Sequence, residues 1–170
     1  MSTNKILLTY ASLYGSTKEV AENIASSLRN TGLEVDMRPI QEVKSVADYR
    51  AIVLGAAIYN ARWHADAHLF LSQYQETLRQ LPLAIFALGP LNKNNVSMQR
   101  SRRQLDKELE KYPWLKPVAL EMFVGKYDTS KLGFFERLTP SSDNRDWEAI
   151  RAWANALPAQ LSIDKVAQSD

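Results

Sequence analysis

One strand–turn–helix segment near the start of the chain constrains the fold more than any other. The uncharged apolar run over 6–11 predicts a strand buried on both faces, as in a parallel sheet. Gly15 then allows the backbone to turn, and Ser16 followed by Glu19 predicts a capping box at a helix start. That helix is expected to end at Gly32 and carries apolar residues at helical spacing, namely Val20, Ile24 and Leu28.

The turn between this strand and helix is rich in hydroxyl groups, from Ser12, Tyr14, Ser16 and Thr17. The unpaired N–H groups and the positive dipole end of a helix bind anions, most often phosphate. None of the four side chains is a cation, so the turn fits a terminal phosphate monoester better than a nucleoside triphosphate. The alternative is that the serine and threonine residues only cap the helix.

Composition narrows the class of protein. A chain of 170 residues with 45% hydrophobic and 24% charged residues is typical of one globular domain. It contains no cysteine, so any redox chemistry must come from a bound cofactor. No apolar run approaches a membrane span and no signal peptide is evident, so we expect a cytoplasmic protein. The net charge of +2 does not suggest a nucleic-acid partner.

Strand and helix patterns alternate along the rest of the chain. Strands are expected over 33–40, 50–58, 83–90 and 116–125, and the alternating polarity of 33–40 predicts a sheet edge, where Pro39 is tolerated. Helical spacing is carried by three sets of residues: Ala67, Leu71, Tyr74 and Leu78; Leu105, Leu109 and Tyr112; and Trp147, Ile150, Ala154, Leu157 and Leu161, in a helix that opens near Asp143.

This alternation predicts an α/β fold. We expect a three-layer sandwich in which a five-stranded parallel sheet, order 2-1-3-4-5, has helices on both faces. Residues 1–161 would form a single domain, and the polar tail over 162–170 is expected to fray.

A ligand in such a sheet contacts the loops that follow strands one, three and four. Residues 57–64 combine aromatic and small side chains, which suits a planar ring such as a flavin. Residues 89–95 offer a turn, backbone donors and amide side chains to the polar edge of the ring. For Tyr59 or Trp63 taken singly, the favoured alternative is an aromatic plug in the core.

The pattern Ser-x-Tyr-Gly-Ser-Thr over 12–17 resembles the phosphate loop of flavodoxin-like FMN proteins, with Tyr14 in place of threonine. Three further segments are similar to the menaquinone-dependent protoporphyrinogen dehydrogenase family within that superfamily: Gly55–Tyr59, Gly125–Tyr127 and Asp146–Ile150. The resemblance implies a flavodoxin-like fold, bound FMN, and electron transfer from a porphyrinogen to a quinone.

The resemblance also implies a set of FMN-binding residues. Ser12, Tyr14, Gly15, Ser16 and Thr17 would hold the phosphate; Ala57, Ile58, Tyr59, Asn60, Gly89, Pro90 and Asn92 would line the ring; Gly125, Lys126 and Tyr127 would lie beside it. That family has a long insertion where this chain has a brief connection over 128–142. Its apolar residues, Leu132, Phe134, Phe135 and Leu138, predict a helical piece that covers the end of the sheet, with a membrane-facing or substrate-covering flap as the alternative.

Two other groups of residues are candidates for function. Arg100, Arg102, Arg103 and Lys107, together with Lys93, could bind porphyrinogen carboxylates, an acidic redox partner or an anionic membrane, but a solvated helix face is the favoured interpretation. His64 and His68 have the spacing of metal ligands, but we assign no metal site. His64 is also considered as a proton donor near the flavin.

Three functions are compared. The first is an FMN oxidoreductase with a small-molecule or quinone redox partner. The second is an electron carrier without a substrate of its own, which ranks lower because such carriers usually have an acidic rim. The third, a phosphorylation-controlled receiver, lacks its acidic residues, since Ser12 and Ala57 stand in those regions. The sequence allows a peripheral membrane contact and indicates neither a catalytic acid or base nor an oligomeric state.

Overall fold

The computed structural model describes residues 4–12, 15–90, 94–127 and 142–163. Within these ranges, five parallel strands form one sheet in the order β2-β1-β3-β5-β6. The strands are β1 (Lys5–Ala11), β2 (Glu34–Pro39), β3 (Ala51–Tyr59), β5 (Leu83–Leu88) and β6 (Ala119–Phe123). The predicted order 2-1-3-4-5 is confirmed, because the strand labelled β4 (Arg62–Trp63) is a short antiparallel addition to β3.

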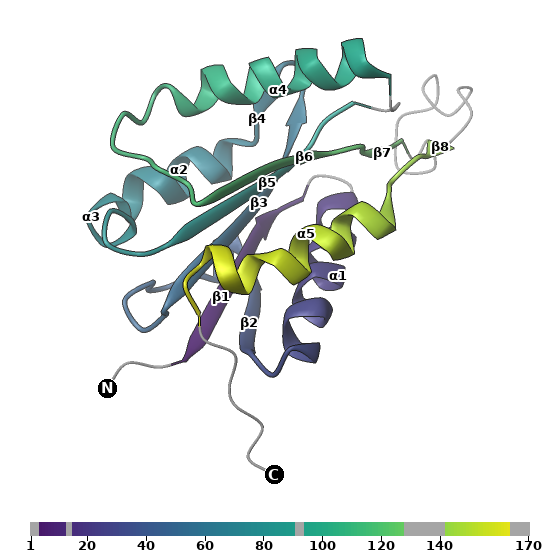
Figure 1. Cartoon of the computed structure of the whole chain (residues 1–170). Helices are drawn as coiled ribbons and strands as arrows, with labels where there is room; N and C mark the ends of the chain where they lie inside the picture. The colour runs from purple at the N-terminus through teal and green to yellow at the C-terminus, as the bar shows by residue number, and fades with distance from the viewer. Residues whose placement is uncertain (1–3, 13–14, 91–93, 128–141, 164–170) are drawn as a thin grey trace.

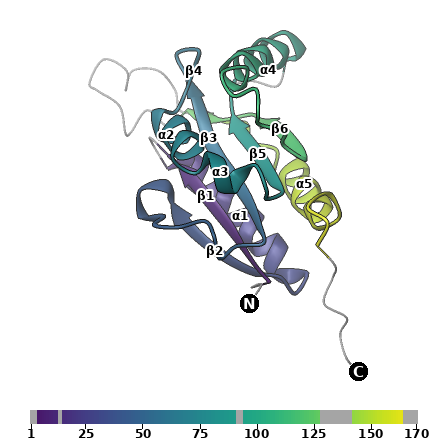
Figure 2. The same cartoon turned by 90° about the vertical axis from the view of Figure 1, so that its left-hand side faces the viewer.

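Helices cover both faces of the sheet (Figures 1 and 2). The helices α1 (Ser16–Asn30) and α5 (Trp147–Gln160) pack together on one face, and α2 (Ala65–Gln73), α3 (Gln75–Leu78) and α4 (Asn95–Leu109) lie on the other. A 3-10 turn, η1 (Ile40–Glu42), follows β2, and β7 (Lys126–Tyr127) pairs with β8 (Ser142–Asp143) in a separate two-stranded ribbon. The three-layer architecture agrees with the prediction.

Each face of the sheet has its own hydrophobic core, because successive strand side chains point to opposite faces. In β1, Ile6 and Leu8 belong to the core beneath α1 and α5, whereas Leu7 belongs to the core beneath α2, α3 and α4. The apolar residues predicted for the first and last helices are buried in the first core, with Trp147 packed at its margin: Val20, Ile24, Leu28, Ile150, Ala154, Leu157 and Leu161.

The predicted edge strand is also confirmed. In the described part of the chain β2 pairs only with β1; Val35 is buried, Glu34 and Arg38 are exposed, and the other residues of the strand are half-buried. Pro39 ends the strand, so its missing N–H removes no bond from the centre of the sheet. None of the helices in the described ranges has both the length and the apolar character needed to cross a membrane.

The predicted capping box is wrong. The N-cap of α1 is Gly15, at φ 88°, and no side chain within the described ranges caps the helix. Ser16 is the first helical residue, so its hydroxyl is one position too late to act as the cap. The left-handed conformation at Gly15 turns the backbone in a single residue, and the first-turn N–H groups of α1 have no side-chain cap among the residues that the structure describes.

Other helix boundaries differ by a few residues from the expected ones. The second predicted helix breaks at Tyr74, so that α2 and α3 are separate. The helix α4 ends before Tyr112, although the side chain of Tyr112 still packs against the same core. The last helix begins at Trp147 and not near Asp143, because the side chain of Asp146 accepts a hydrogen bond from the Ala149 N–H.

The segment 57–64, expected to be a loop, forms a β-hairpin. The strand β3 continues to Tyr59, and Asn60 and Ala61 form the turn at φ 50° and 60° before β4. Two successive left-handed residues are the mark of a type I′ turn. Trp63 is a core plug, 3% exposed, with its Nε1–H donating to the Ala56 carbonyl at 3.3 Å, whereas Tyr59 remains 51% exposed.

The polar tail begins later than expected. Ser162 adopts φ 54°, and the Ile163 N–H donates to the Pro158 carbonyl at 2.9 Å, which closes α5 with a Schellman motif. The Ile163 side chain is buried in the core beneath α1 and α5, so the chain stays packed through this residue. Residues 164–170 and the predicted helical piece around Leu132, Phe134, Phe135 and Leu138 lie outside the described residues.

Candidate functional site

The candidate site lies at the carboxyl edge of the parallel sheet. A single row of paired residues crosses the sheet near this edge: Ala11, Ala56, Ala87 and Met122. The segments that follow β1, β3, β5 and β6 therefore leave the sheet at one level. This arrangement brings the hydroxyl-rich turn, the hairpin and the segments at 89–90 and 124–126 to the same edge, where ligands bind in open α/β sheets.

The turn before α1 has the donors that a phosphate monoester requires. The Ser12 Oγ accepts a hydrogen bond from the Gly15 N–H at 2.9 Å, which leaves the Ser12 O–H able to donate. The Ser16 Oγ is buried and has no hydrogen-bond partner among the described residues, and Thr17 is 1% exposed. An unpartnered buried hydroxyl beside uncapped helix N–H groups is costly unless an anion accepts from it, so these residues fit a phosphate.

Two segments predicted to contact the flavin ring are bonded to each other. The Gly89 N–H donates to the Phe123 carbonyl and the Gly125 N–H donates to the Pro90 carbonyl, both at 2.9 Å. These bonds extend the β5–β6 pairing past the end of the sheet. The chain after β5 and the chain after β6 therefore form one unit at the site.

The other predicted site residues are distributed around this edge. Ala57 and Ile58 are half-buried, and the His64 N–H donates to the Ala57 carbonyl at 3.2 Å. Tyr59 and Asn60 are exposed at the tip of the hairpin. Lys126 is paired with Asp143 in the β7–β8 ribbon, in which Tyr127 is paired with Ser142. Tyr14 and Asn92 lie outside the described residues.

Arg145 is a residue beside the site that sequence reasoning missed. Its side chain is only 3% exposed, and its Nη1 lies 2.6 Å from the Glu19 Oε2 in the first turn of α1. Its Nε and Nη2 donate to the two carboxylate oxygens of Asp143 at 2.8 and 2.6 Å, and its guanidinium stacks on Trp147 at 4.5 Å from the ring centroid. Arg145 thus fixes the start of α1 to the segment before α5.

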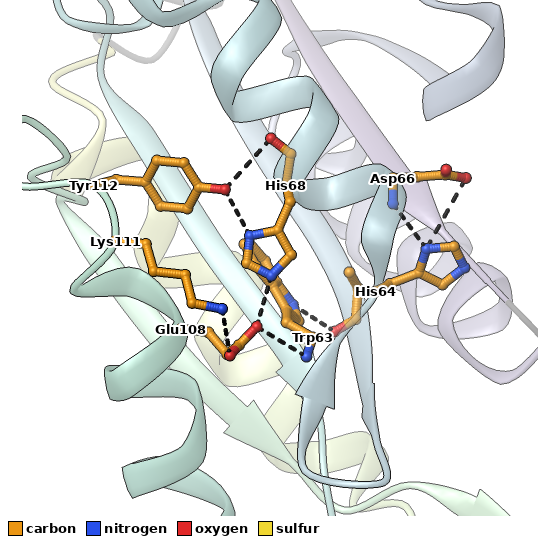
Figure 3. A network of polar contacts seen from close by, with 8 residues as sticks. Trp63, His64, Asp66, His68, Glu108, Lys111 and Tyr112 are labelled. Atoms are coloured by element: carbon orange, nitrogen blue, oxygen red, sulfur yellow. Dashed lines mark hydrogen bonds and ion pairs between the residues drawn. The ribbon is translucent and has the colours of Figure 1, made fainter.

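A second polar network lies between the hairpin, α2 and α4 (Figure 3). The His68 Nε2 lies 2.6 Å from the Glu108 Oε2, and the His68 Nδ1 lies 2.6 Å from the Tyr112 hydroxyl. The Glu108 Oε2 also accepts from the Trp63 N–H at 3.4 Å, and the Lys111 Nζ lies 2.9 Å from the other oxygen. The carboxylate of Glu108 therefore connects β4, α2 and the end of α4.

The two histidines with metal-ligand spacing have different partners. The His64 Nδ1 accepts from the Asp66 N–H at 3.2 Å and so caps α2, whereas His68 belongs to the Glu108 network. Within the described ranges, no three His, Cys, Asp or Glu side chains are grouped so that they could hold a metal ion. The role of His64 as a proton donor stays a prediction.

Residues 7–139 match the family model of the flavodoxin domain. This chain belongs to the flavodoxin family. Members of the flavodoxin family bind FMN, and the predicted family, fold and cofactor are therefore confirmed at the level of the family. The hydroxyl-rich turn of this flavodoxin-family chain is the segment that resembles the family's phosphate loop.

Known relatives narrow the comparison further. The chain is 27% identical, over 177 residues, to protoporphyrinogen IX dehydrogenase (quinone) from Leishmania major. The alignment covers 91% of this chain and 75% of the relative. It is 24% identical over 87 residues to the protein of the same name from Escherichia coli strain K12, where the match spans half of this chain and 48% of the relative. Relatives of this flavodoxin-family chain thus include oxidoreductases.

Solved structures confirm the fold. An archaeal flavodoxin aligns with a TM-score of 0.59 and 12% identity, over 93% of this chain and 99% of its own. A flavo di-iron protein from Thermotoga maritima aligns with a TM-score of 0.62 and 17% identity, over 94% of this chain but only 36% of the larger protein. At these identities the likeness establishes the flavodoxin-like architecture and nothing finer.

Two carboxylates in the networks of this flavodoxin-family chain have a lowered pKa. Hydrogen bonds from Arg145 lower the pKa of Asp143 below its ordinary value of 3.8. Burial raises the pKa of Glu108, but hydrogen bonds from Lys111 and His68 outweigh burial and bring it below its ordinary value of 4.5. Both groups therefore stabilise the folded state in their ionised form.

We expect Asp143 and Glu108 to contribute their full stabilisation above about pH 5, and this part of the free energy of unfolding to be lost as the pH drops through their lowered pKa values. The sign follows because the unfolded chain binds protons at a higher pH than the folded chain does. Urea unfolding between pH 7 and about pH 3 measures the fall. The double variant Asp143→Asn/Glu108→Gln should show a shallower fall, whereas Glu76→Gln/Glu110→Gln, with the same charge change at exposed positions, should match the unmodified protein. Parallel curves for all three proteins would contradict the prediction.

Proposed function

We propose that this chain is an FMN-dependent oxidoreductase that transfers electrons from an organic donor to a quinone, with protoporphyrinogen IX as the first donor to test. The observation that carries the proposal is the start of α1, where no side chain in the described ranges caps the helix, the buried Ser16 hydroxyl has no partner among the described residues, and Thr17 is buried. The names of the curated relatives support the choice of donor and acceptor.

The chain's own residues act by binding and orienting the cofactor. Ser12, Ser16 and Thr17, with the first-turn N–H groups of α1, would hold the phosphate of FMN. The hairpin at 57–60 and the bonded segments at 89–90 and 125 would position the ring. When bound, the flavin supplies the redox chemistry, since it accepts two electrons and can release them singly. We assign no side chain of the chain to proton transfer, and we place the protein in the cytoplasm.

The test begins with the absorbance spectrum of the purified protein, followed by release and identification of the bound flavin. The FMN-loaded protein is then mixed with protoporphyrinogen IX and a quinone under anaerobic conditions, and the fluorescence of protoporphyrin is recorded. We expect protoporphyrin to form only when both quinone and FMN-loaded protein are present. Bound FMN without turnover would instead support an electron carrier, and a protein that does not bind added FMN would overturn the proposal entirely.

A further inference from the structure

One flank of α4 carries cations that form no ion pair with a carboxylate of the described residues. Val96, Arg100, Arg103 and Lys107 recur at helical spacing and therefore lie along one side of the helix. In the part of the chain that the structure describes, no carboxylate forms an ion pair with Arg100, Arg103 or Lys107.

The neighbouring charges of α4 are engaged with other residues. Arg102 pairs with Asp106 at 3.0 Å, and Glu108 is bound by Lys111 and His68. The acidic residues of this stretch are Asp106, Glu108 and Glu110. The first two are in these ion pairs, and Glu110 is exposed beside the flank. The predicted solvated face is therefore neutralised around Arg102 but not along the flank.

The flank is also hollowed. Arg100, Arg103, Gln104 and Lys107 line an open groove of about 340 Å³, beside the face on which Ser101 and Leu105 are buried. Val96 lies at one end of this flank, in the first turn of α4, and its side chain is 71% exposed. The α4 flank thus presents an apolar end, three cations and a shallow groove.

The position of the α4 flank connects it with the candidate site. The helix α4 leads from β5 back to the start of the parallel strand β6, so its first turn lies at the carboxyl edge of the sheet (Figure 1). Val96 is therefore at the edge that carries the hydroxyl-rich turn and the hairpin, and the three cations extend from there along the outer layer.

We propose that the α4 flank docks this protein on an anionic membrane surface. A bilayer is recognised by charge and by shallow insertion of apolar side chains, which the row of three cations and the exposed Val96 provide. Arginine side chains also anchor protein partners, so an acidic protein is the alternative that the test below separates from a bilayer. This inference rests on the proposed function, because a lipid-soluble quinone would be reached from such a surface.

The test uses the full chain loaded with FMN and sedimentation with lipid vesicles. Vesicles of phosphatidylcholine are compared with vesicles that also contain phosphatidylglycerol, at low and at physiological salt. We expect weak binding to the anionic vesicles only, and a loss of binding as salt is raised. Each cation near an anionic surface contributes about a fivefold gain in binding, so Arg100→Gln/Arg103→Gln/Lys107→Gln should weaken it about a hundredfold.

The matched control is Lys44→Gln/Arg79→Gln/Arg151→Gln, which removes three exposed cations from other parts of the surface. It should bind vesicles almost as well as the unmodified protein. Equal binding by both triple variants, or no binding to anionic vesicles, would overturn the proposal. Binding to an acidic protein matrix that depends on the flank, without binding to vesicles, would assign the flank to a protein partner and also overturn it.

Flavin absorbance recorded on the same samples separates this proposal from the proposed function. If the protein binds anionic vesicles through the flank but takes up no FMN, the membrane proposal stands and the oxidoreductase proposal fails. If the protein reduces a water-soluble quinone but does not bind vesicles, the oxidoreductase proposal stands and the membrane proposal fails.

Discussion

FMN affinity is expected to fall at least about a hundredfold when Gly15 and Thr17 are both replaced by leucine. Gly15 is in the left-handed region at φ 88°, where a side chain costs about 1–2 kcal/mol. Thr17 is 1% exposed in the first turn of α1, and its loss removes a hydroxyl from the proposed phosphate site. A hydrogen bond to a charged group contributes about 1.5–3 kcal/mol, and relief of the strain at position 15 moves the first-turn N–H groups away from the phosphate, so the two changes together account for the expected loss. Titration of the apoprotein with FMN, followed by flavin fluorescence, measures the affinity.

A matched control lies at the other end of the same helix. Thr31→Leu/Gly32→Leu replaces the same two residue types, and Gly32 is also at φ 88°, but with no atom within 4 Å of the position of an added Cβ. This control should lose stability and keep its FMN affinity. If the Gly15/Thr17 variant retained native circular dichroism and full FMN affinity, the hydroxyl-rich turn would not be the phosphate site.

The second large effect concerns the centre of the sheet. Gly55 is paired with Phe86 across β3 and β5, and a Cβ at Gly55 would lie 2.0 Å from the Phe86 Cζ. Phe86 is fully buried and contacts Phe123 and Trp153, so its ring has little room to move. We expect Gly55→Ala to lower the free energy of unfolding by about 3 kcal/mol, because overpacking at a buried position displaces neighbours. Thermal unfolding should register this as a decrease in Tm of about 6–12 °C.

A double-mutant cycle tests the assigned cause. In Gly55→Ala/Phe86→Leu, the shorter side chain makes room for the new methyl group, so the double variant should be more stable than the sum of the single effects by at least about 1 kcal/mol. Gly32→Ala serves as the comparison, since its methyl group meets no neighbouring atom and its cost, which comes from the φ of 88°, should not change when Phe86→Leu is added. Additive effects in the cycle would show that Phe86 is not the group displaced.

The order of the sheet could be predicted because each strand carries its environment in its sequence. The uncharged runs of β1 and β3 indicate strands with neighbours on both sides, and the alternation in β2 indicates an edge. The patterns reflect how far each strand is buried, and a central strand is buried more completely than an edge strand. The turn at Gly15 was predictable for a different reason: it needs one residue in the left-handed conformation, and glycine is the residue that adopts this conformation most easily.

Features that depend on an unusual residue or on a distant partner could not be predicted. The hairpin after β3 was missed because its turn has Ala61 at a left-handed position where glycine is usual. Ser16 and Glu19 fit a capping box in the sequence, yet the Ser16 hydroxyl has no hydrogen-bond partner among the described residues and Glu19 pairs with Arg145. Nothing in the local sequence around Arg145 indicates that its guanidinium is buried against a carboxylate in the first helix.

The contact between Arg145 and Glu19 has a consequence for assembly of the site during synthesis. Chains are made from the N-terminus, so the strand and helix that carry the hydroxyl-rich turn emerge from the ribosome first. Their helix packs on β1, β2 and β3 as those strands are made, but it gains its contacts with Arg145 and α5 only when these have followed. A nascent chain therefore gains the Arg145–Glu19 ion pair beside the hydroxyl-rich turn only after all the strands from β1 to β6 have been made.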